Sequence, residues 1–352
     1  MVSTDKRSAG VSRRGFLRSS AAVGASAVLG FPAYAQQKPG KLVIASGGGA
    51  LDEAYKVAYY EPWRAQTGMS IVSSPNPAAQ LKAMVEQKAV EWDVAQVAAE
   101  VAATLGRQGL LEPLDYSVID KSMLIPGVAH ETFLMSDVAA YHIAWNTKQI
   151  KSPAAPKDWA QFWKAPGRHG LWKRPFQTLE VALLADGVSM DKLYPLDVDR
   201  GLKSLDKLKA NIFWWERGAQ VAQILIDGEV DMSAAWNGRV YQPKLDGAPV
   251  DFHLNQSVLI SDAWVVPKGA PNKRESMQFI ASTLAADRQA AFTRKIPYGP
   301  VNPAALKLLD ATLLAAIPSS SENIRKGVFL DVNWWADNGD KTGERFNKWL
   351  LG

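Results

Sequence analysis

One acidic residue stands inside an apolar stretch of the chain. Asp262 interrupts the run Val258–Val266, whose other residues are mostly those of a buried β-strand. A buried carboxylate is costly unless a cation pairs with it, so we expect an internal Arg or Lys, or a cationic ligand, beside it. A second strand-length run, Val230–Trp236, ends in an indole, and α/β sheets bind ligands at the carboxyl ends of their strands. The alternative interpretation is structural, with Trp236 in the core and Asp262 in an internal ion pair.

The sequence around these residues, together with two further segments, resembles a known family. The chain is similar to the extracellular solute-binding proteins of ABC importers, above all the spermidine/putrescine type, in the segments DGEVDMSAAWNGR, SDAWVVPKGAPNK, YGPVN and NWWADNGDKTGERFNKW. The resemblance covers roughly residues 41–351. It implies an α/β, two-lobed periplasmic-binding-protein fold of type II, with two crossover strands and a ligand cleft between the lobes.

Three positions match the ligand contacts of the polyamine-binding proteins. The resemblance places Trp236 where the family packs an indole on the alkyl-ammonium chain, and Asp262 where a carboxylate grips an amine. Tyr298 falls on a ligand-contacting tyrosine. We therefore interpret the protein as the substrate-binding component of an ABC importer, which captures a small amine-bearing solute, a polyamine such as putrescine or spermidine, and delivers it to the permease.

Other positions depart from the polyamine pattern. Gly47 and Gly48 stand where the family has aromatic residues, and Glu100 stands at another aromatic position. Two acidic positions that hold the distal amine fall on Arg174 and Gln177. An arginine there would repel a second ammonium group and could clasp a carboxylate or a phosphonate in fork geometry.

These departures leave the ligand open. An amine beside Asp262 and an anion beside Arg174 and the amides of Gly47–Gly49 would suit an ω-amino acid such as γ-aminobutyrate, or an aminoalkyl phosphonate. If Arg174 instead pairs internally with Glu180 or Asp186, an ordinary diamine site remains. A thiamine-like cation is a further alternative, because related proteins bind such cations.

Residues for catalysis are sparse. The four histidines lack metal-ligand spacing, and the chain has neither a cysteine nor a G-x-S-x-G nucleophile motif. We therefore expect no enzyme activity, no metal and no cofactor; a periplasmic enzyme on the same fold and a partner of a receptor kinase are the alternatives from other classes. The expected partners are the amine ligand and the permease subunits with their cytoplasmic ATPase, and the chain is expected to be a monomer.

The first 35 residues have the features of an export signal. Ser12–Arg18 has the twin-arginine pattern, an apolar segment follows at Ala21–Phe31, and Ala33–Ala35 is an A-x-A cleavage site. We therefore expect a periplasmic protein that begins near Gln36. This segment holds five basic residues and one acidic residue, so only about +1 of the net charge of +5 belongs to the rest of the chain. That balance gives no basis for nucleic-acid binding.

The expected elements divide the chain into a first lobe, a second lobe and a C-terminal part that rejoins the first lobe. Strands and helices alternate over residues 40–142, the pattern of a parallel α/β lobe. The strands are expected at 41–45, 69–73 and 92–97, and the helices at 51–67, after Asn76-Pro77, and at 100–108. Residues 143–260 should form the second lobe, with a loop-rich passage at Trp159–Trp163 and three helices, at 179–186, 198–208 and 218–226. Residues 261–352 should return to the first lobe and end in helices.

Overall fold

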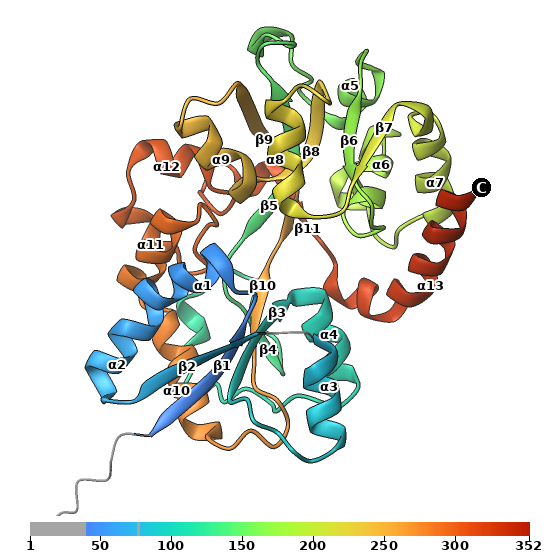
Figure 1. Ribbon diagram of the computed structural model, residues 1–352. Coiled ribbons are helices and arrows are strands. Elements are labelled where there is room, and N and C mark those ends of the chain that lie inside the picture. Colours follow the sequence, from blue (N-terminus) through green and yellow to red (C-terminus); the bar gives the residue numbers. More distant parts are fainter. Residues whose placement is uncertain (1–39, 76–77) are drawn as a thin grey trace, which may run out of the picture. The chain divides into compact units, whose positions relative to one another are not determined.

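The computed structural model describes residues 40–75 and 78–352 (Figure 1). The predicted export signal, its cleavage site and the predicted helix start at Asn76-Pro77 lie outside the described residues. Within the described part of the chain, no helix is long and apolar enough to cross a membrane.

The first of two sheets has five strands, in the order β2-β1-β3-β10-β4. They are β1 (Lys41–Ser46), β2 (Ser70–Pro75), β3 (Val94–Ala98), β4 (Phe133–Met135) and β10 (Asp262–Val265). β1 pairs in parallel with β2 and β3, as the alternation of strands and helices predicted, whereas β10 runs antiparallel to β3 and β4. A strand from late in the chain thus completes a sheet that is otherwise built from its first part.

The helices associated with this sheet bury aromatic side chains against β10. They are α1 (Gly49–Tyr55), a π-helical stretch (Lys56–Tyr60), α2 (Glu61–Thr67), α3 (Ala78–Glu86), α4 (Ala99–Arg107), α10 (Lys273–Thr283) and α11 (Ala286–Lys295). Tyr55 is fully buried, with its ring 5.0 Å from that of Trp264 on β10 and 5.2 Å from that of Phe292 on α11. This packing fixes Tyr55 beside β10.

The second sheet has six strands, in the order β11-β9-β5-β8-β6-β7. They are β5 (Ala139–Asn146), β6 (His169–Trp172), β7 (Ile212–Trp215), β8 (Met232–Trp236), β9 (Val250–Ile260) and β11 (Gly327–Phe329). β6 runs parallel to β7 and to β8, so the carboxyl ends of these three strands share one edge. The associated helices are α5 (Trp159–Lys164), α6 (Thr178–Ala185), α7 (Val198–Asp206), α8 (Gly218–Ile226) and α9 (Asn237–Leu245).

The apolar run Val258–Val266 is not one strand, and this corrects the sequence interpretation. β9 ends at Ile260 in the second sheet, and β10 begins at Asp262 in the first. Between them, the carbonyl of Ser261 accepts the backbone N–H of Ala99, the first residue of α4, at 3.0 Å. Because that carbonyl is bonded to a helix rather than to a neighbouring strand, the ladder is interrupted there and the chain passes from one sheet to the other.

A second correction concerns Trp159–Trp163. The surrounding prolines favoured a loop there. The segment forms α5, whose first turn is capped by the Asp158 carboxylate accepting the backbone N–H of Gln161 at 2.7 Å. Pro156 and Pro166 lie outside the helix on either side, so they limit its length and leave its hydrogen bonds intact.

The C-terminal part of the chain contains α12 (Ala311–Ala316) and α13 (Val332–Leu351). α13 forms ion pairs with two elements that are far apart in sequence, through Asp337 with Arg107 of α4 and through Arg345 with Asp199 of α7. β11, which precedes it, pairs with β9 of the second sheet. The lobe boundaries expected from the sequence therefore remain a proposal, because residues after 261 contribute to both sheets.

Candidate ligand-binding site

Two of the connections between the sheets carry the same dipeptide. Ser136-Asp137 lies between β4 and β5, and Ser261-Asp262 lies at the break between β9 and β10. The backbone N–H of Ser136 donates to the carbonyl of Asp262 at 2.8 Å, and the backbone N–H of Asp262 donates to the carboxyl group of Asp137. Two carboxyl groups from distant parts of the sequence are therefore neighbours.

Asp137 was not selected from the sequence, yet it is the more deeply buried of the two. It is 0% exposed; the hydroxyl of Ser136 donates to its Oδ2 at 2.6 Å, while its Oδ1 has no hydrogen-bond partner among the described residues. Burial raises the pKa of Asp137 well above its ordinary value, and the Asp262 carboxyl raises it further. Burial also raises the pKa of Asp262, against the opposing effect of a hydrogen bond with Gln96. The one signal in the sequence was that both acids follow a serine and precede an apolar run.

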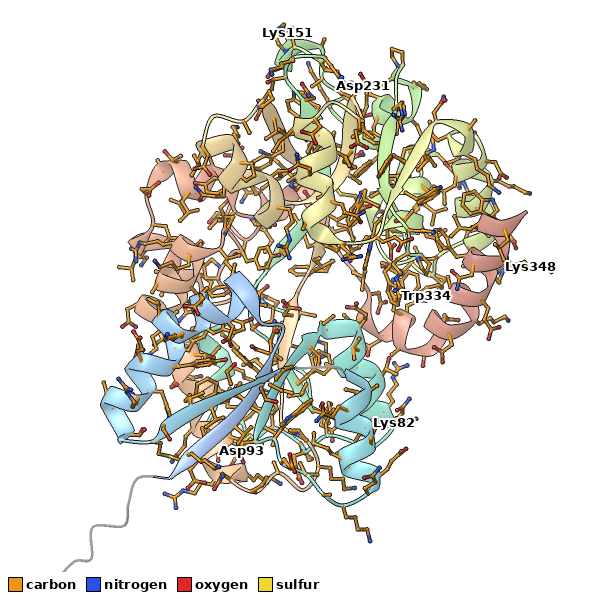
Figure 2. The ribbon with its side chains drawn as sticks, in the orientation of Figure 1. Lys82, Asp93, Lys151, Asp231, Trp334 and Lys348 are labelled. Atoms are coloured by element: carbon orange, nitrogen blue, oxygen red, sulfur yellow. The ribbon has the colours of Figure 1, made fainter. Side chains whose placement is uncertain are left out.

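Asp93, labelled in Figure 2, shows how a structural carboxylate is satisfied in this chain. Its Oδ2 accepts the backbone N–H of Val43 at 2.8 Å, and its Oδ1 accepts the backbone and side-chain N–H groups of Asn272 at 2.9 Å and 3.0 Å. By contrast, neither Asp137 nor Asp262 forms an ion pair within residues 40–75 and 78–352. A cationic ligand is thus the partner that remains to be tested for Asp262.

Glu100 and Tyr298 lie near Asp262. Glu100 is in the first turn of α4, whose first N–H is bonded to the residue before Asp262. Burial raises the pKa of Glu100 to about 7, and the charges of Asp262 and Glu180 add to this effect. The pKa of Tyr298 is also raised, first by burial and then by Asp262, whereas Arg239 opposes the shift. Tyr298 is therefore close enough to both Asp262 and Arg239 for each charge to affect its pKa.

Trp236 and Gln177 are in direct contact. The indole Nε1 of Trp236, at the end of β8, donates to Oε1 of Gln177 at 2.7 Å. The half-buried ring packs edge-on against Trp172 and Trp215, with centroid distances of 4.9 Å and 5.1 Å. Gln177 precedes α6 with φ of 64°, a strained conformation for a residue other than glycine. The strained backbone and the hydrogen bond together fix the orientation of the indole.

Arg174 has none of the internal partners that the sequence suggested. Glu180 accepts the hydroxyl of Tyr194 and the indole N–H of Trp335, each at 2.6 Å. Asp186 pairs with Arg200 at 2.8 Å and with Lys207 at 2.5 Å. Arg174 itself is exposed and forms no ion pair in the described part of the chain. It contributes only weakly to the lowered pKa of Glu216, so its guanidinium remains available to a ligand.

The carboxyl edge shared by β6, β7 and β8 is basic. Four cations follow these strands: Lys173, Arg174, Arg217 and Arg239. Lys173 is paired with Glu216 at 2.8 Å. Arg239, which was not selected from the sequence, lies beside Trp236, because a Cβ built on Gly218 would be 2.9 Å from Nε of Arg239 and 2.8 Å from the Trp236 ring. A cation thus adjoins the predicted indole.

Gly47 and Gly48 belong to the loop that joins β1 to α1. They are exposed residues between β1 and α1, and Gly48 has φ of 70°. Beside them the Asp52 carboxylate accepts the hydroxyls of Ser46 and Ser73 at 2.6 Å and 2.7 Å. No hydrogen bond among the described residues joins either glycine to Asp137 or Asp262. The predicted anion contacts of this loop stay a prediction.

We expect Gly238→Ala to weaken ligand binding. A Cβ at Gly238 would lie 2.7 Å from Cε1 of Tyr298, so the tyrosine would have to shift beside Asp262. Overpacking of this kind costs about 1–3 kcal/mol. The measurement is calorimetric affinity together with thermal unfolding. Gly343→Ala on α13 is the matched control, since nothing lies within 4 Å of its Cβ; it should leave affinity unchanged and stabilise the helix. Equal affinities for the two variants would remove Tyr298 from the site.

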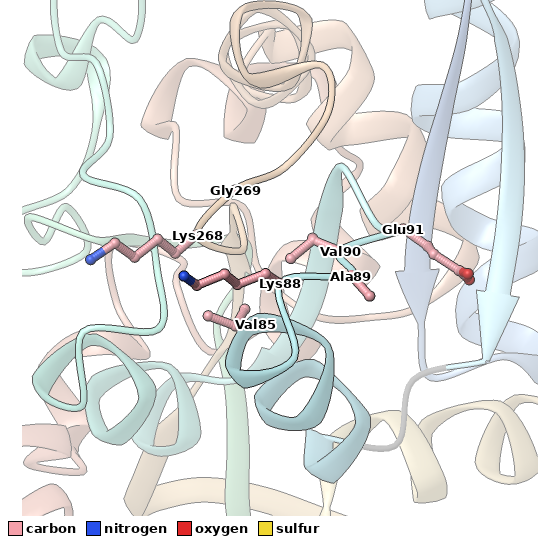
Figure 3. A pocket seen from close by; sticks show the side chains of 7 residues that line it. All are labelled: Val85, Lys88, Ala89, Val90, Glu91, Lys268 and Gly269. Carbon is pink, nitrogen blue, oxygen red and sulfur yellow. The ribbon is translucent and has the colours of Figure 1, made fainter.

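The hollow in Figure 3 is a separate feature. It is lined by residues of the end of α3, of the segment between α3 and β3, and of the turn after β10: Val85, Lys88, Ala89, Val90, Glu91, Lys268 and Gly269. None of the predicted ligand contacts is among them. Across the described residues, no group of three His, Asp or Glu side chains is placed to hold a metal ion.

Comparison with known proteins identifies the family. Residues 59–340 match the family model for bacterial extracellular solute-binding proteins. The chain belongs to this family. This solute-binding protein is 38% identical over 336 residues to the gamma-aminobutyric acid-binding protein of Pseudomonas aeruginosa, covering 91% of this chain and 94% of the relative. It is 24% identical over 215 residues to the spermidine/putrescine-binding periplasmic protein of Escherichia coli, covering 58% of this chain and 62% of the relative.

A solved structure confirms the predicted fold class. The structure of the Atu4243 GABA receptor matches with a TM-score of 0.82 and 38% sequence identity, over 88% of this chain and 97% of the other. The α/β, type II periplasmic-binding-protein fold that the sequence predicted is therefore the fold of this solute-binding protein. The relatives are transport proteins that bind solutes, not enzymes.

Proposed function

We propose that this solute-binding protein captures an ω-amino acid of the γ-aminobutyrate type in the periplasm and delivers it to the permease of an ABC importer. The ligand assignment rests on one observation, that acidic and basic groups are concentrated in two different regions. Acidic groups lie where the chain crosses between the sheets, and unpaired arginines lie at the carboxyl edge of β6, β7 and β8. A zwitterion with its two charges at opposite ends complements both regions.

A series of neighbouring residues connects the acidic region to the basic one. The charge of Asp262 raises the pKa of Tyr298, and the ring of Tyr298 packs against Gly238. Arg239 follows Gly238 in the chain and lies beside Trp236. The proposed ligand would place its ammonium group at Asp262, its alkyl chain along Tyr298 and Trp236, and its carboxylate at Arg239 or Arg174.

The polyamine interpretation is less well supported than this alternative. A polyamine carries an ammonium group at each end, so its distal end would meet an arginine where the family has acids. The relative that binds γ-aminobutyrate is also more similar to this chain, at 38% identity, than the polyamine-binding relative, at 24%. The proposed ligand contacts also include Glu100, Gln177, Gly47 and Gly48. Export through the twin-arginine pathway is likewise a proposal.

A thermal-unfolding screen of the chain from Gln36 onward tests the proposal. Ligand that binds only the folded state raises the melting temperature by mass action. We expect a larger rise with γ-aminobutyrate than with putrescine, n-butylamine or butyrate at equal concentration, because each of these lacks one of the two charges or carries the wrong one. A rise with putrescine alone would restore the polyamine interpretation. A fall in γ-aminobutyrate concentration during incubation would instead indicate an enzyme.

A further inference from the structure

Gln177 adopts a conformation that its own helix does not require. It stands at the N-cap position of α6 with φ of 64°, where glycine would be unstrained. A polar side chain at this position usually caps the helix, but that of Gln177 forms no cap. Its Oε1 instead accepts the indole N–H of Trp236 at 2.7 Å. Because strained backbone is retained mainly where a site depends on it, this contact points to a role in ligand binding.

The hydrogen bond with Trp236 determines which end of the Gln177 amide is left for a ligand. An indole has one N–H donor and no acceptor, so only the amide oxygen can be its partner. Nε2 of Gln177 has no hydrogen-bond partner among the described residues. The side chain as a whole is 4% exposed, yet Nε2 is not one of the fully buried polar atoms that lack a partner. The amide N–H donors of Gln177 therefore keep accessible surface beside the indole.

Glu180, one turn further along α6, does not provide the acceptor that Gln177 lacks. It is 0% exposed, and its Oε1 already accepts the hydroxyl of Tyr194 and the indole N–H of Trp335. Its Oε2 is also fully buried. Beside the Trp236 ring, the guanidinium of Arg239 is a further group with donors only. An ammonium group placed here would meet N–H donors rather than an oxygen that could bind it.

We propose that Gln177 positions the Trp236 indole for the ligand and, because its oxygen is engaged in that contact, excludes a second ammonium group from this end of the site. This inference deepens the proposed function and rests on it. A glutamate would offer two oxygens, one for the indole and one for an ammonium group. Gln177 would therefore be a specificity-determining residue that separates ligands with one ammonium group from diamines.

The ratio of putrescine affinity to n-butylamine affinity, measured by calorimetry, isolates the second ammonium group. The two ligands share the four-carbon chain and the first ammonium group. Gln177→Glu should raise this ratio by at least about tenfold, because the new carboxylate oxygen would bind the second ammonium group. Gln87→Glu is the matched control, since it adds the same charge at an exposed residue in the turn after α3. No rise in Gln177→Glu, or an equal rise in Gln87→Glu, would overturn the proposal.

The indole N–H resonance of Trp236 tests the positioning role in the ligand-free protein. The resonance is assigned by its loss in Trp236→Phe. It should move upfield in Gln177→Met, which has no oxygen, and stay in place in Gln177→Glu, because a carboxylate also accepts the indole N–H. Affinity for n-butylamine should fall in Gln177→Met and be restored in Gln177→Glu. An unchanged resonance in Gln177→Met would contradict the positioning role.

These measurements separate the inference from the proposed function, because neither needs γ-aminobutyrate. If the unmodified protein failed to bind γ-aminobutyrate while Gln177→Glu still gained putrescine affinity, the proposed function alone would be wrong. If γ-aminobutyrate bound and the ratio stayed the same in Gln177→Glu, the selectivity assigned to Gln177 alone would be wrong.

Discussion

Asp262→Asn is expected to weaken γ-aminobutyrate binding by at least about thirtyfold, because removing one partner of a buried charge pair costs about 2–5 kcal/mol. The same change should make the ligand-free protein more stable at neutral pH. Burial raises the pKa of Asp262 in the folded protein, so between the unfolded and folded pKa values the folded state holds more protons. Stability therefore falls as pH rises through that window and stays lower above it. Asparagine carries no charge and avoids this loss.

The measurements are calorimetric affinity and the pH dependence of the free energy of unfolding. Asp93→Asn is the matched control, because Asp93 is a buried carboxylate that accepts three N–H groups. It should lower stability by about 1–3 kcal/mol and leave affinity unchanged in the folded fraction. If Asp262→Asn behaved like this control, Asp262 would be a structural residue and the proposed site would be wrong.

Replacing the arginines at the carboxyl edge should change selectivity rather than binding in general. Hydrogen bonds to a charged group contribute about 1.5–3 kcal/mol. Replacing the arginine that receives the carboxylate, by Arg239→Gln or Arg174→Gln, should therefore weaken γ-aminobutyrate binding by at least about tenfold. Binding of n-butylamine, which has the ammonium group and no carboxylate, should not weaken. The ratio of the two affinities, measured by calorimetry, is the quantity to follow.

The control for this series is Arg64→Gln on α2, an exposed arginine without an ion pair among the described residues. It should leave both affinities unchanged. An equal loss for both ligands in an edge variant would indicate a structural role for that arginine. A loss in only one of the two edge variants would identify which guanidinium receives the carboxylate.

Much of the fold was predictable from local pattern. The strand predicted at 41–45 is β1, and the helix predicted at 218–226 is α8, because apolar spacing and flanking glycines report local conformation directly. The division of Val258–Val266 into two strands was not predictable. An apolar run has the same sequence pattern whether its residues belong to one sheet or to two. α5 was missed because prolines beside a short helix resemble prolines within a loop.

The sequence by itself determined the family, the α/β fold class and three elements of the proposed site: a carboxylate in an apolar run, an indole at a strand end, and an arginine where an acid was expected. Only the tertiary structure decided which charges are left for a ligand. Glu180 and Asp186 were plausible partners for Arg174 until Tyr194, Trp335, Arg200 and Lys207 were found to occupy them. Likewise Ser136 and Asp262 lie 126 residues apart in sequence, so the carboxyl pair arises only when two crossing segments bond to each other. Charge is a property of a residue, but its compensation depends on neighbours that folding brings together.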